Sequence, residues 1–365
     1  MKGENNTNRG RLRGYMFELV VRKWLEVNGF IPIASLNQKF RSNLVKQERL
    51  SFTELRGRGC WHQIDIPCVY AHFIPFINPI KLLAEVKFYT KAITKEHVRE
   101  FIGVVKDISE NYFVPIDHYS DNNENGAPNE SQRFSELGVF FSASGFDYEA
   151  EGLAYAHNIK TISYKNNPLV DKISEIIRTI EANDLYARDC ISKGHDSDFK
   201  RSFYSMLYDD GEVRDFVSRF GASDGIMEHL YELQNSIAAI KSVFLGTTNE
   251  GIILQFFSES VFPDFLFIDQ DEQLCEVYYE GNGYYLSFYM CFSRDEQRTR
   301  FYFIPPISLM SSVPQGQNEV LLQKERHFAE VSILKRIEGK KRIITLKLNE
   351  AWADGVRRIY ATRPR

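Results

Sequence analysis

The chain has 365 residues, of which 43% are hydrophobic and 26% charged, and its formal net charge is −4. This composition is typical of a soluble globular protein with enough material for two domains, and it excludes a disordered chain. It also excludes binding of nucleic acid by bulk charge alone, and no apolar run approaches the length of a membrane span. The five cysteines include no Cys-x-x-Cys pair, which predicts reduced thiols and a cytoplasmic location.

Charge is distributed unevenly along the chain. Residues 1–60 carry 12 basic and 5 acidic side chains, a balance of +7, and residues 324–365 carry the same numbers. Residues 107–151 carry 10 acidic side chains and one arginine, a balance of −9. Two basic ends would suit phosphate contact, because phosphate contacts dominate the affinity of proteins for duplexes. Solvated surface is the more common explanation of any single patch of this kind.

A helix over residues 14–29 is the first predicted element. Its apolar residues recur at helical spacing, Glu18 lies beside them, and Asn28-Gly29 is a typical helix end. The N-terminal residues before it are polar and arginine-rich, unlike a secretory signal.

The rest of residues 10–165 alternates between strands and helices. Helices are expected over 94–107 and after Asp147, which can cap the second one, and a polar, turn-rich loop is expected over 117–135. A strand, a helix and a strand within about 30 residues form a crossover unit, which favours parallel pairing. The expected strands are 62–70, 81–89, 137–144 and 159–164.

The alternation of strands and helices gives way to a different order of elements near residue 198. Two helical stretches precede a series of strands rich in Phe and Tyr, and turns such as the one at 280–283 join some of them, which predicts an antiparallel meander. The aromatic residues would suit base stacking, but core packing is their more common use. The expected strands are 262–268, 274–280, 284–292, 299–304, 328–337 and 342–349.

The most informative motif is Glu85-Val86-Lys87, inside the strand expected over 81–89. Glu85 and Lys87 are two residues apart, so both face the same side of the sheet. Burial of two ionisable groups on one face is costly unless they pair or hold a metal. Asp65 lies in the preceding strand-like run. An Asp followed by Glu-x-Lys about one hairpin later is the layout of a metal-dependent phosphodiesterase.

Hydrolysis of a phosphodiester needs a divalent cation and a water that loses a proton near neutral pH. Asp65 and Glu85 are expected to hold Mg²⁺, which Mn²⁺ could replace, and the backbone carbonyl of Val86 is a further candidate ligand. Lys87 is expected to orient or deprotonate the attacking water and to offset charge on the phosphate.

Four nearby residues have supporting roles in this prediction. Glu18 is expected to bind a second ion or the metal-bound water. Gln63, on the same predicted strand face as Asp65, is expected to contact the water or the scissile phosphate. Arg56 and Arg58 are candidates for contact with DNA phosphates.

Other candidate residues are less specific. His62 could be a ligand or a base, but a structural hydrogen bond is the more common role of a lone histidine beside Trp61. Cys60 and Cys68 match no common zinc spacing. The chain has no Gly-x-x-x-x-Gly-Lys-Ser/Thr loop, so an ATP-driven step would come from a partner.

The order of these motifs resembles the PD-(D/E)xK restriction-endonuclease-like superfamily, and most closely its Mrr-type branch. The resemblance covers residues 10–165 and implies Mg²⁺-dependent cleavage of DNA around a mixed sheet. Two features depart from the family pattern: Ile64 replaces the Pro that gives the family its name, and a loop lengthens the interval between Asp65 and Glu85. The resemblance rests on Gly14-x-x-Phe17-Glu18, Asp65, Glu85-x-Lys87 and Ser142-x-Ser144-Gly145-Phe146-x-x-Glu149-Ala150.

We therefore predict an α/β protein with two domains. Residues 1–185 are expected to form a nuclease domain with a restriction-endonuclease-like mixed sheet flanked by helices. Residues 198–365 are expected to form a helical and β-rich domain for specificity, sensing or dimerisation. The resemblance implies DNA as the partner and a role in bacterial defence or restriction, and a partner ATPase or other defence subunit is a further candidate. A homodimer would cleave both strands, because one site cuts one strand. No membrane contact is expected.

Two alternatives stay open at this point. The chain could be a non-catalytic protein that uses the same fold to bind nucleic acid or protein. The joint presence of Asp65, Glu85 and Lys87 argues against that, since a degenerate site has little reason to keep all three. The chain could also be an RNA-directed nuclease, or one gated by a small signalling molecule that binds residues 198–365.

Overall fold

The computed structural model divides the chain into two compact units. The first comprises Met1–Ser142, Glu149–Thr161 and Ile180–Met227, and the second Ala143–Tyr148, Ile162–Thr179 and Glu228–Arg365. The predicted loop over 117–135 falls largely outside the described residues. The structure describes residues 2–35, 45–49, 52–72, 77–110, 133–181, 184–185, 196–208, 211–221, 223, 225–282 and 285–361.

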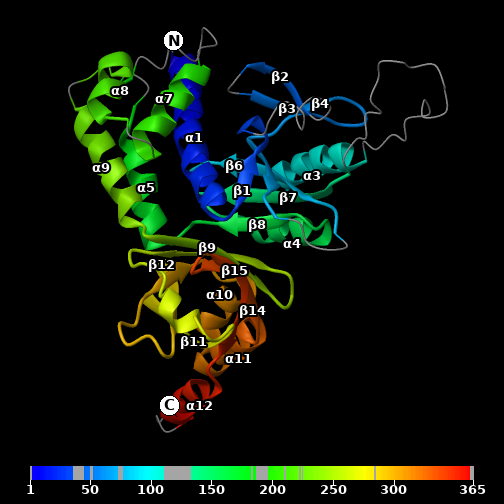
Figure 1. Ribbon diagram of the computed structural model, residues 1–365, viewed down its shortest axis with the longest axis vertical. Helices are drawn as coiled ribbons and strands as arrows, with labels where there is room; N and C mark the ends of the chain where they lie inside the picture. The colour runs from blue at the N-terminus through cyan, green and yellow to red at the C-terminus, as the bar shows by residue number, and fades with distance from the viewer. Residues whose placement is uncertain are drawn as a thin grey trace, which may run out of the picture. The chain divides into compact units, whose positions relative to one another are not determined.

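A five-stranded mixed sheet lies largely in the first unit (Figure 1). Its strand order is β1-β5-β6-β7-β8. Strand β6 pairs antiparallel with β5 and parallel with β7. The predicted α/β class is confirmed at this level. The strands are β1 (Phe30–Pro32), β5 (Ile66–Tyr70), β6 (Ile80–Lys87), β7 (Ser135–Ser142) and β8 (Lys160–Ser163).

Strand β6 occupies the centre of this sheet because its middle residues are apolar on both faces. Leu82, Leu83 and Ala84 are all buried, as expected for a strand covered on both sides. The register with β7 places Lys81 opposite Glu136, and their side chains form a buried ion pair with 2.8 Å between Nζ and Oε1. A slip in register would leave two buried charges unpaired, so this pair fixes the alignment of β6 and β7.

Two helices pack on the sheet. Helix α1 (Lys2–Val27) contacts β6 and ends as predicted, because Gly29 adopts a φ of +87°, a left-handed conformation that favours glycine. It begins earlier than the sequence pattern indicated. Helix α3 (Lys95–Ser109) packs on β7, with the rings of Phe101 and Phe140 5.5 Å apart.

Further helices extend the first unit beyond the sheet. Helices α7 and α8 belong to this unit, and an interlocking group of phenylalanine rings joins them, with Phe199 5.6 Å from Phe216 and 5.5 Å from Phe220. Helix α5 belongs to the second unit, and α9 begins in the first and continues in the second. The helices are α4 (Tyr148–Ala156), α5 (Pro168–Thr179), α7 (Asp196–Tyr208), α8 (Val213–Phe220) and α9 (Ile226–Ala239).

The continuous strand predicted over 62–70 is wrong. Strand β4 (Trp61–Gln63) joins β2 (Val45–Arg49) and β3 (Phe52–Arg56) in a separate three-stranded sheet, whereas β5 belongs to the five-stranded sheet. Asp65 lies between the two strands, where its side chain makes a hydrogen bond in place of the strand ladder.

A closed seven-stranded barrel forms the centre of the second unit (Figure 1). Its order is β10-β13-β12-β11-β15-β14-β9, and six of its seven pairings are antiparallel. The predicted meander is therefore correct for most pairs, but β11 and β15 pair in parallel and close the barrel. The strands are β9 (Ser242–Thr248), β10 (Ile253–Ser258), β11 (Glu272–Asn282), β12 (Tyr285–Phe292), β13 (Phe301–Phe303), β14 (Val331–Ile337) and β15 (Lys340–Leu348).

Several elements of this unit differ from the sequence pattern. Strands β9 and β10 were not predicted, and the strand expected over 262–268 is the short helix η3 (Asp264–Phe267). Pro263 explains the second difference, because it has no N–H to donate to a strand ladder. Three helices also accompany the barrel: α10 (Ile307–Ser312), α11 (Gln317–Phe328) and α12 (Glu350–Ala361).

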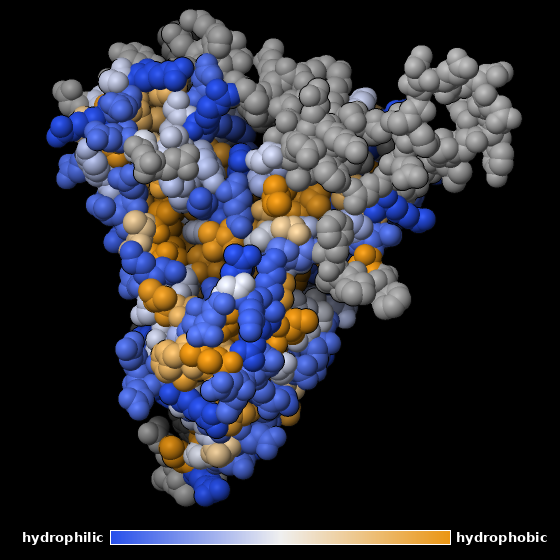
Figure 2. Space-filling model, viewed as in Figure 1, coloured by the Kyte–Doolittle hydropathy of each residue, from blue (hydrophilic) through white to orange (hydrophobic). Residues whose placement is uncertain are grey.

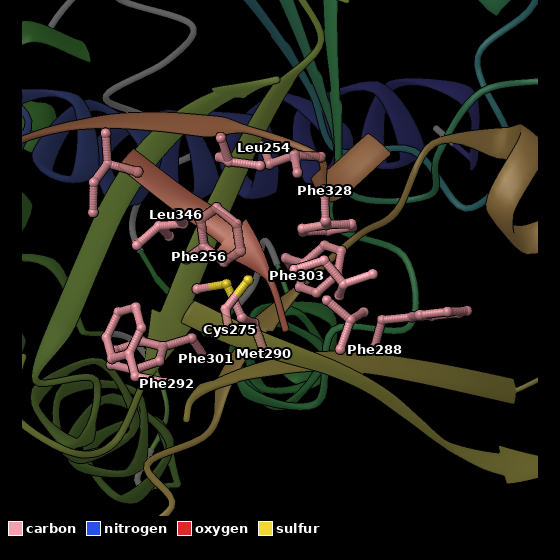
Figure 3. Packing of buried hydrophobic residues seen from close by; sticks show 14 of the residues in the cluster. Leu254, Phe256, Cys275, Phe288, Met290, Phe292, Phe301, Phe303, Phe328 and Leu346 are labelled. Carbon is pink, nitrogen blue, oxygen red and sulfur yellow. The ribbon is translucent and has the colours of Figure 1, made fainter. Parts of the chain in front are cut away.

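Phenylalanine fills the barrel, as core packing predicts (Figure 3). The rings of Phe244 and Phe256 stack at 4.8 Å, and Phe256 lies 5.2 Å from Phe303. Three tyrosines alternate with core residues along β11, β12 and β13 and therefore face outward, whereas Tyr279 packs against the core. Tyr278, Tyr289 and Tyr302 form a row across β11, β12 and β13. Base stacking stays a prediction for this outer row and not for the buried phenylalanines.

Hydrophilic residues cover most of the coloured surface in the view of Figure 2. Among the described residues, no helix has the length and apolar character needed to cross a membrane.

Gly138 provides a test of the packing between α3 and β7. A Cβ at this position would lie 2.6 Å from Ile159 Cδ1 and 2.9 Å from Val105 Cγ2. Gly138→Ala is therefore expected to lower the free energy of unfolding by about 1–3 kcal/mol through overpacking. Gly103→Ala, on the open face of α3, is the matched control and is expected to raise it by roughly 0.5–1 kcal/mol. Urea denaturation measures both, and equal effects would contradict the packing argument.

Candidate functional site

Asp65, Glu85 and Lys87 meet at the end of β6. The Lys87 ammonium forms an ion pair with Glu85 Oε1, and its Nζ lies 3.6 Å from Asp65 Oδ2. The three side chains are 19–24% exposed, so the group is largely buried but open to solvent on one side. The structure therefore brings together the three residues that the sequence singled out.

The end of strand β5 explains how Asp65 reaches this position. The pairing of β5 with β6 stops at Ile66 opposite Ala84, so β5 does not extend to pair with Val86. Asp65 Oδ2 instead accepts a hydrogen bond of 2.9 Å from the Val86 N–H. A backbone group at the end of a ladder needs a partner, and the carboxylate supplies it. This bond fixes Asp65 beside the Glu-x-Lys motif.

The Val86 carbonyl lies on the side of β6 that faces Asp65. The N–H and C=O of one strand residue point toward the same neighbour. Because the Val86 N–H points to Asp65, its carbonyl faces the same edge of β6. The role of Val86 O as a backbone ligand stays a prediction.

Burial and repulsion between carboxylates shape the electrostatics of this group. Burial, followed by the charge of Asp65, raises the pKa of Glu85 from 4.5 to about 7, and Lys87 opposes this rise. Burial lowers the pKa of Lys87, but Asp65 and Glu85 more than offset it and raise the pKa above its ordinary value. Lys87 is therefore a cation here, which favours the predicted orienting and charge-stabilising roles over the removal of a proton from water.

Glu18 is held by a lysine that the sequence did not reveal. Lys200 on α7 donates hydrogen bonds to both carboxylate oxygens of Glu18, at 2.8 and 2.9 Å. Burial raises the pKa of Glu18 from 4.5 to about 7; Lys200 opposes this rise and Asp65 adds to it. Glu18 thus lies within electrostatic reach of Asp65, but it can bind a second ion only if Lys200 gives way. The two partners are 182 residues apart in sequence, and no motif marks Lys200.

The other predicted contact residues lie in or beside the three-stranded sheet. Gln63 is exposed on β4, opposite Glu54 of β3, and so belongs to a different sheet from the Glu-x-Lys motif. Arg56 is exposed on β3. The Arg58 side chain, in the following loop, is 67% exposed, and its Nη1 lies 3.6 Å from Glu110 Oε2. Both arginines remain accessible to a phosphate.

Comparison with known proteins leaves the family open. No protein-family model matches the chain. No curated protein matches it. A solved structure titled as a protein of unknown function, AF1548, aligns with 61% of this chain and 97% of its own, at 13% identity and a TM-score of 0.27. A likeness at this level carries no argument about the fold or the activity.

The raised carboxyl pKa values predict how stability depends on pH in the absence of metal. Glu18 and Glu85 titrate near 4.5 when unfolded and at about 7 in the folded chain. Between these values the folded chain binds more protons, so these groups make the free energy of unfolding fall as pH rises from about 4.5 to about 7. Glu85→Gln should flatten that fall. Urea denaturation in EDTA across this range measures it, and identical slopes for both proteins would contradict the assignment.

The Glu18–Lys200 pair predicts a separate effect on stability. Both side chains are nearly buried, at 13% and 10% exposure. Lys200→Met should lower the free energy of unfolding by about 1–3 kcal/mol, because it leaves the buried carboxyl group of Glu18 without its two hydrogen bonds. The double variant Lys200→Met, Glu18→Gln should recover part of this loss. If the double variant is no more stable than Lys200→Met, the pair does not act as the geometry indicates.

Proposed function

We propose that the protein is a metal-dependent nuclease that hydrolyses DNA phosphodiester bonds at Asp65, Glu85 and Lys87. The supporting observation is the convergence of two carboxylates and a lysine, with Asp65 anchored by the Val86 N–H. An ordinary surface ion pair needs neither a second carboxylate nor a backbone anchor, and it would not raise the pKa of Glu85 to about 7.

The donor atoms fit Mg²⁺. Asp65, Glu85 and the Val86 carbonyl offer the oxygen ligands that this ion prefers. Asp65 raises the pKa of Glu85, so the two carboxylates repel each other, and a divalent cation held by both would relieve that repulsion. When bound, Mg²⁺, or Mn²⁺ in its place, would neutralise charge on the phosphate and acidify water.

Lys87 would act directly on the reacting groups. Its ammonium carries a fixed positive charge between Asp65 and Glu85. In that position it would orient the attacking water by hydrogen bonding and stabilise the negative charge that develops on the phosphate oxygens. The partial exposure of the three side chains leaves a path for a phosphodiester to reach them.

The family proposal follows from the site and the sheet together. We assign the sheet β1-β5-β6-β7-β8, with α1 and α3, to the restriction-endonuclease-like fold and to its Mrr-type branch. On this basis we propose a cytoplasmic enzyme of bacterial defence that acts as a homodimer on duplex DNA, with a partner ATPase or other defence subunit. Arg56 and Arg58 would contact phosphates outside the cleavage site.

Cleavage of plasmid DNA tests the proposal. The wild-type protein with Mg²⁺ or Mn²⁺ should nick or linearise the plasmid, and EDTA should stop the reaction. Asp65→Asn, Glu85→Ala and Lys87→Ala should each lower the rate at least about a hundredfold, because each removes charge at the reacting phosphate. Asp65→Asn keeps an oxygen that can accept the Val86 hydrogen bond, so it separates charge from folding.

Lys95→Ala and Glu149→Ala are the matched controls. These residues also form a lysine–carboxylate ion pair, at 2.6 Å, but on the exposed surface. Their rates should equal that of the wild type. Equal cleavage by all variants would remove the site assignment. Salt-sensitive DNA binding without metal-dependent cutting would favour the non-catalytic alternative. Cutting of RNA alone would favour an RNA-directed nuclease, and cutting only after addition of a nucleotide signal would favour a nuclease gated by a small molecule.

A further inference from the structure

A second group of metal-ligand types lies outside the Glu-x-Lys motif. Cys60 Sγ is 3.4 Å from His62 Nε2, and Asp107 Oδ2 is 2.6 Å from the same nitrogen. Among the described residues, these three offer ligand atoms that all lie within 4.8 Å of one another. Cys60 lies in the loop before β4, His62 lies in β4, and Asp107 lies in α3.

The arrangement differs from a catalytic relay. In a nucleophile–histidine–carboxylate relay, the nucleophile and the carboxylate contact opposite nitrogens of the ring. Here Cys60 and Asp107 approach the same nitrogen of His62. One Nε2 proton cannot serve both partners well. A cation at the point where the three atoms converge would bond to all of them.

Backbone N–H groups donate hydrogen bonds to the Asp107 carboxylate. Asp107 Oδ1 accepts a hydrogen bond of 2.9 Å from Gly59 N–H, and Oδ2 accepts a longer one of 3.4 Å from Cys60 N–H. The Asp107 carbonyl accepts a further bond of 2.9 Å from Arg58 N–H. Carboxylates that bind metals are commonly oriented by hydrogen bonds of this kind.

The loop before β4 is shaped around these ligands. A Cβ at Gly57 would lie 2.0 Å from Asp107 Oδ2 and 2.9 Å from His62 Cδ2. Only a residue without a side chain allows the carboxylate and the imidazole to approach the backbone so closely. Gly57 therefore makes room for the cluster without contributing a ligand.

We propose that Cys60, His62 and Asp107 bind one Zn²⁺ ion, with a fourth position open to water. Thiolate and imidazole ligands select zinc over magnesium, and three protein ligands with one open position are a common zinc environment. Binding releases the Cys60 thiol proton to solvent, and neutral His62 binds through Nε2 with its ring proton on Nδ1. The 3.4 Å between Cys60 and His62 already suits a tetrahedral site, whereas Asp107 must withdraw from His62 until their ligand atoms are roughly 3.3 Å apart.

Such a site would join the loop before β4 to α3. The metal would cross-link residues 47 positions apart in sequence, Cys60 and Asp107. The ion should therefore stabilise the folded chain, because the folded chain brings the three ligands together and the unfolded chain does not. This inference does not depend on nuclease activity.

Cobalt substitution tests the site. The full-length protein, freed of metal with a chelator, should show thiolate-to-cobalt charge-transfer absorption in the near ultraviolet that saturates at one Co²⁺ per chain. Zn²⁺ should remove the absorption, and excess Mg²⁺ should not. Cys60→Ser should abolish the absorption and weaken Zn²⁺ binding roughly tenfold or more, since even partners of ligands contribute that much. Cys60 is exposed, so this change spares the core.

Two further variants make the test decisive. Cys68→Ala removes a buried thiol outside the cluster and should leave the cobalt absorption unchanged. Gly57→Ala leaves all three ligands but places a methyl group against Asp107, and it should weaken binding of Zn²⁺. Circular dichroism confirms folding of each variant. Absence of thiolate absorption in the wild type, or its persistence in Cys60→Ser, would overturn the proposal.

Discussion

The hydrogen bond from the Val86 N–H to Asp65 is the interaction on which the arrangement of the candidate site depends. The chain leaves the three-stranded sheet at Gln63 and enters the five-stranded sheet at Ile66. Between them, the Asp65 carboxylate replaces the next backbone partner of β6. One bond therefore terminates the β5–β6 ladder, satisfies a backbone donor and sets a negative charge beside Glu85. An apolar residue at position 65 would do none of these.

Lysines keep the acidic groups of this unit compatible with burial. Lys81 pairs with Glu136, Lys200 with Glu18, and Lys87 with both Asp65 and Glu85. The Lys81 pair has one carboxylate and is nearly inaccessible, at 7% and 4% exposure, so its role is to fix strand register. The Lys87 group has two carboxylates and remains partly exposed. A cation-binding site requires an excess of negative charge that solvent can reach. A purely structural ion pair has no such requirement.

Local patterns in the sequence predicted most helices of the first unit and the β6 motif, because helical spacing and strand alternation act over a few residues. These local patterns did not predict pairings between residues far apart in the sequence. The partnership of Lys200 with Glu18 spans 182 residues. The parallel pairing of β11 with β15 depends on barrel closure rather than on either strand's own pattern. The division of 62–70 into two strands depends on a side-chain hydrogen bond, which periodicity does not report.

Donor chemistry separates the two proposed cation sites even though Cys60, His62 and Asp65 are close in sequence. Asp65 and Glu85 present only oxygen, which suits Mg²⁺, whereas Cys60 and His62 present sulfur and nitrogen, which suit Zn²⁺. The two sets have different structural partners. His62, in β4, contacts Asp107 on α3, whereas Asp65, which follows β4, contacts β6. Each ion would therefore meet its own ligands, and loss of one set of ligands need not remove the other. A short stretch of chain can thus combine a hard-cation site with a soft-cation site without competition between them.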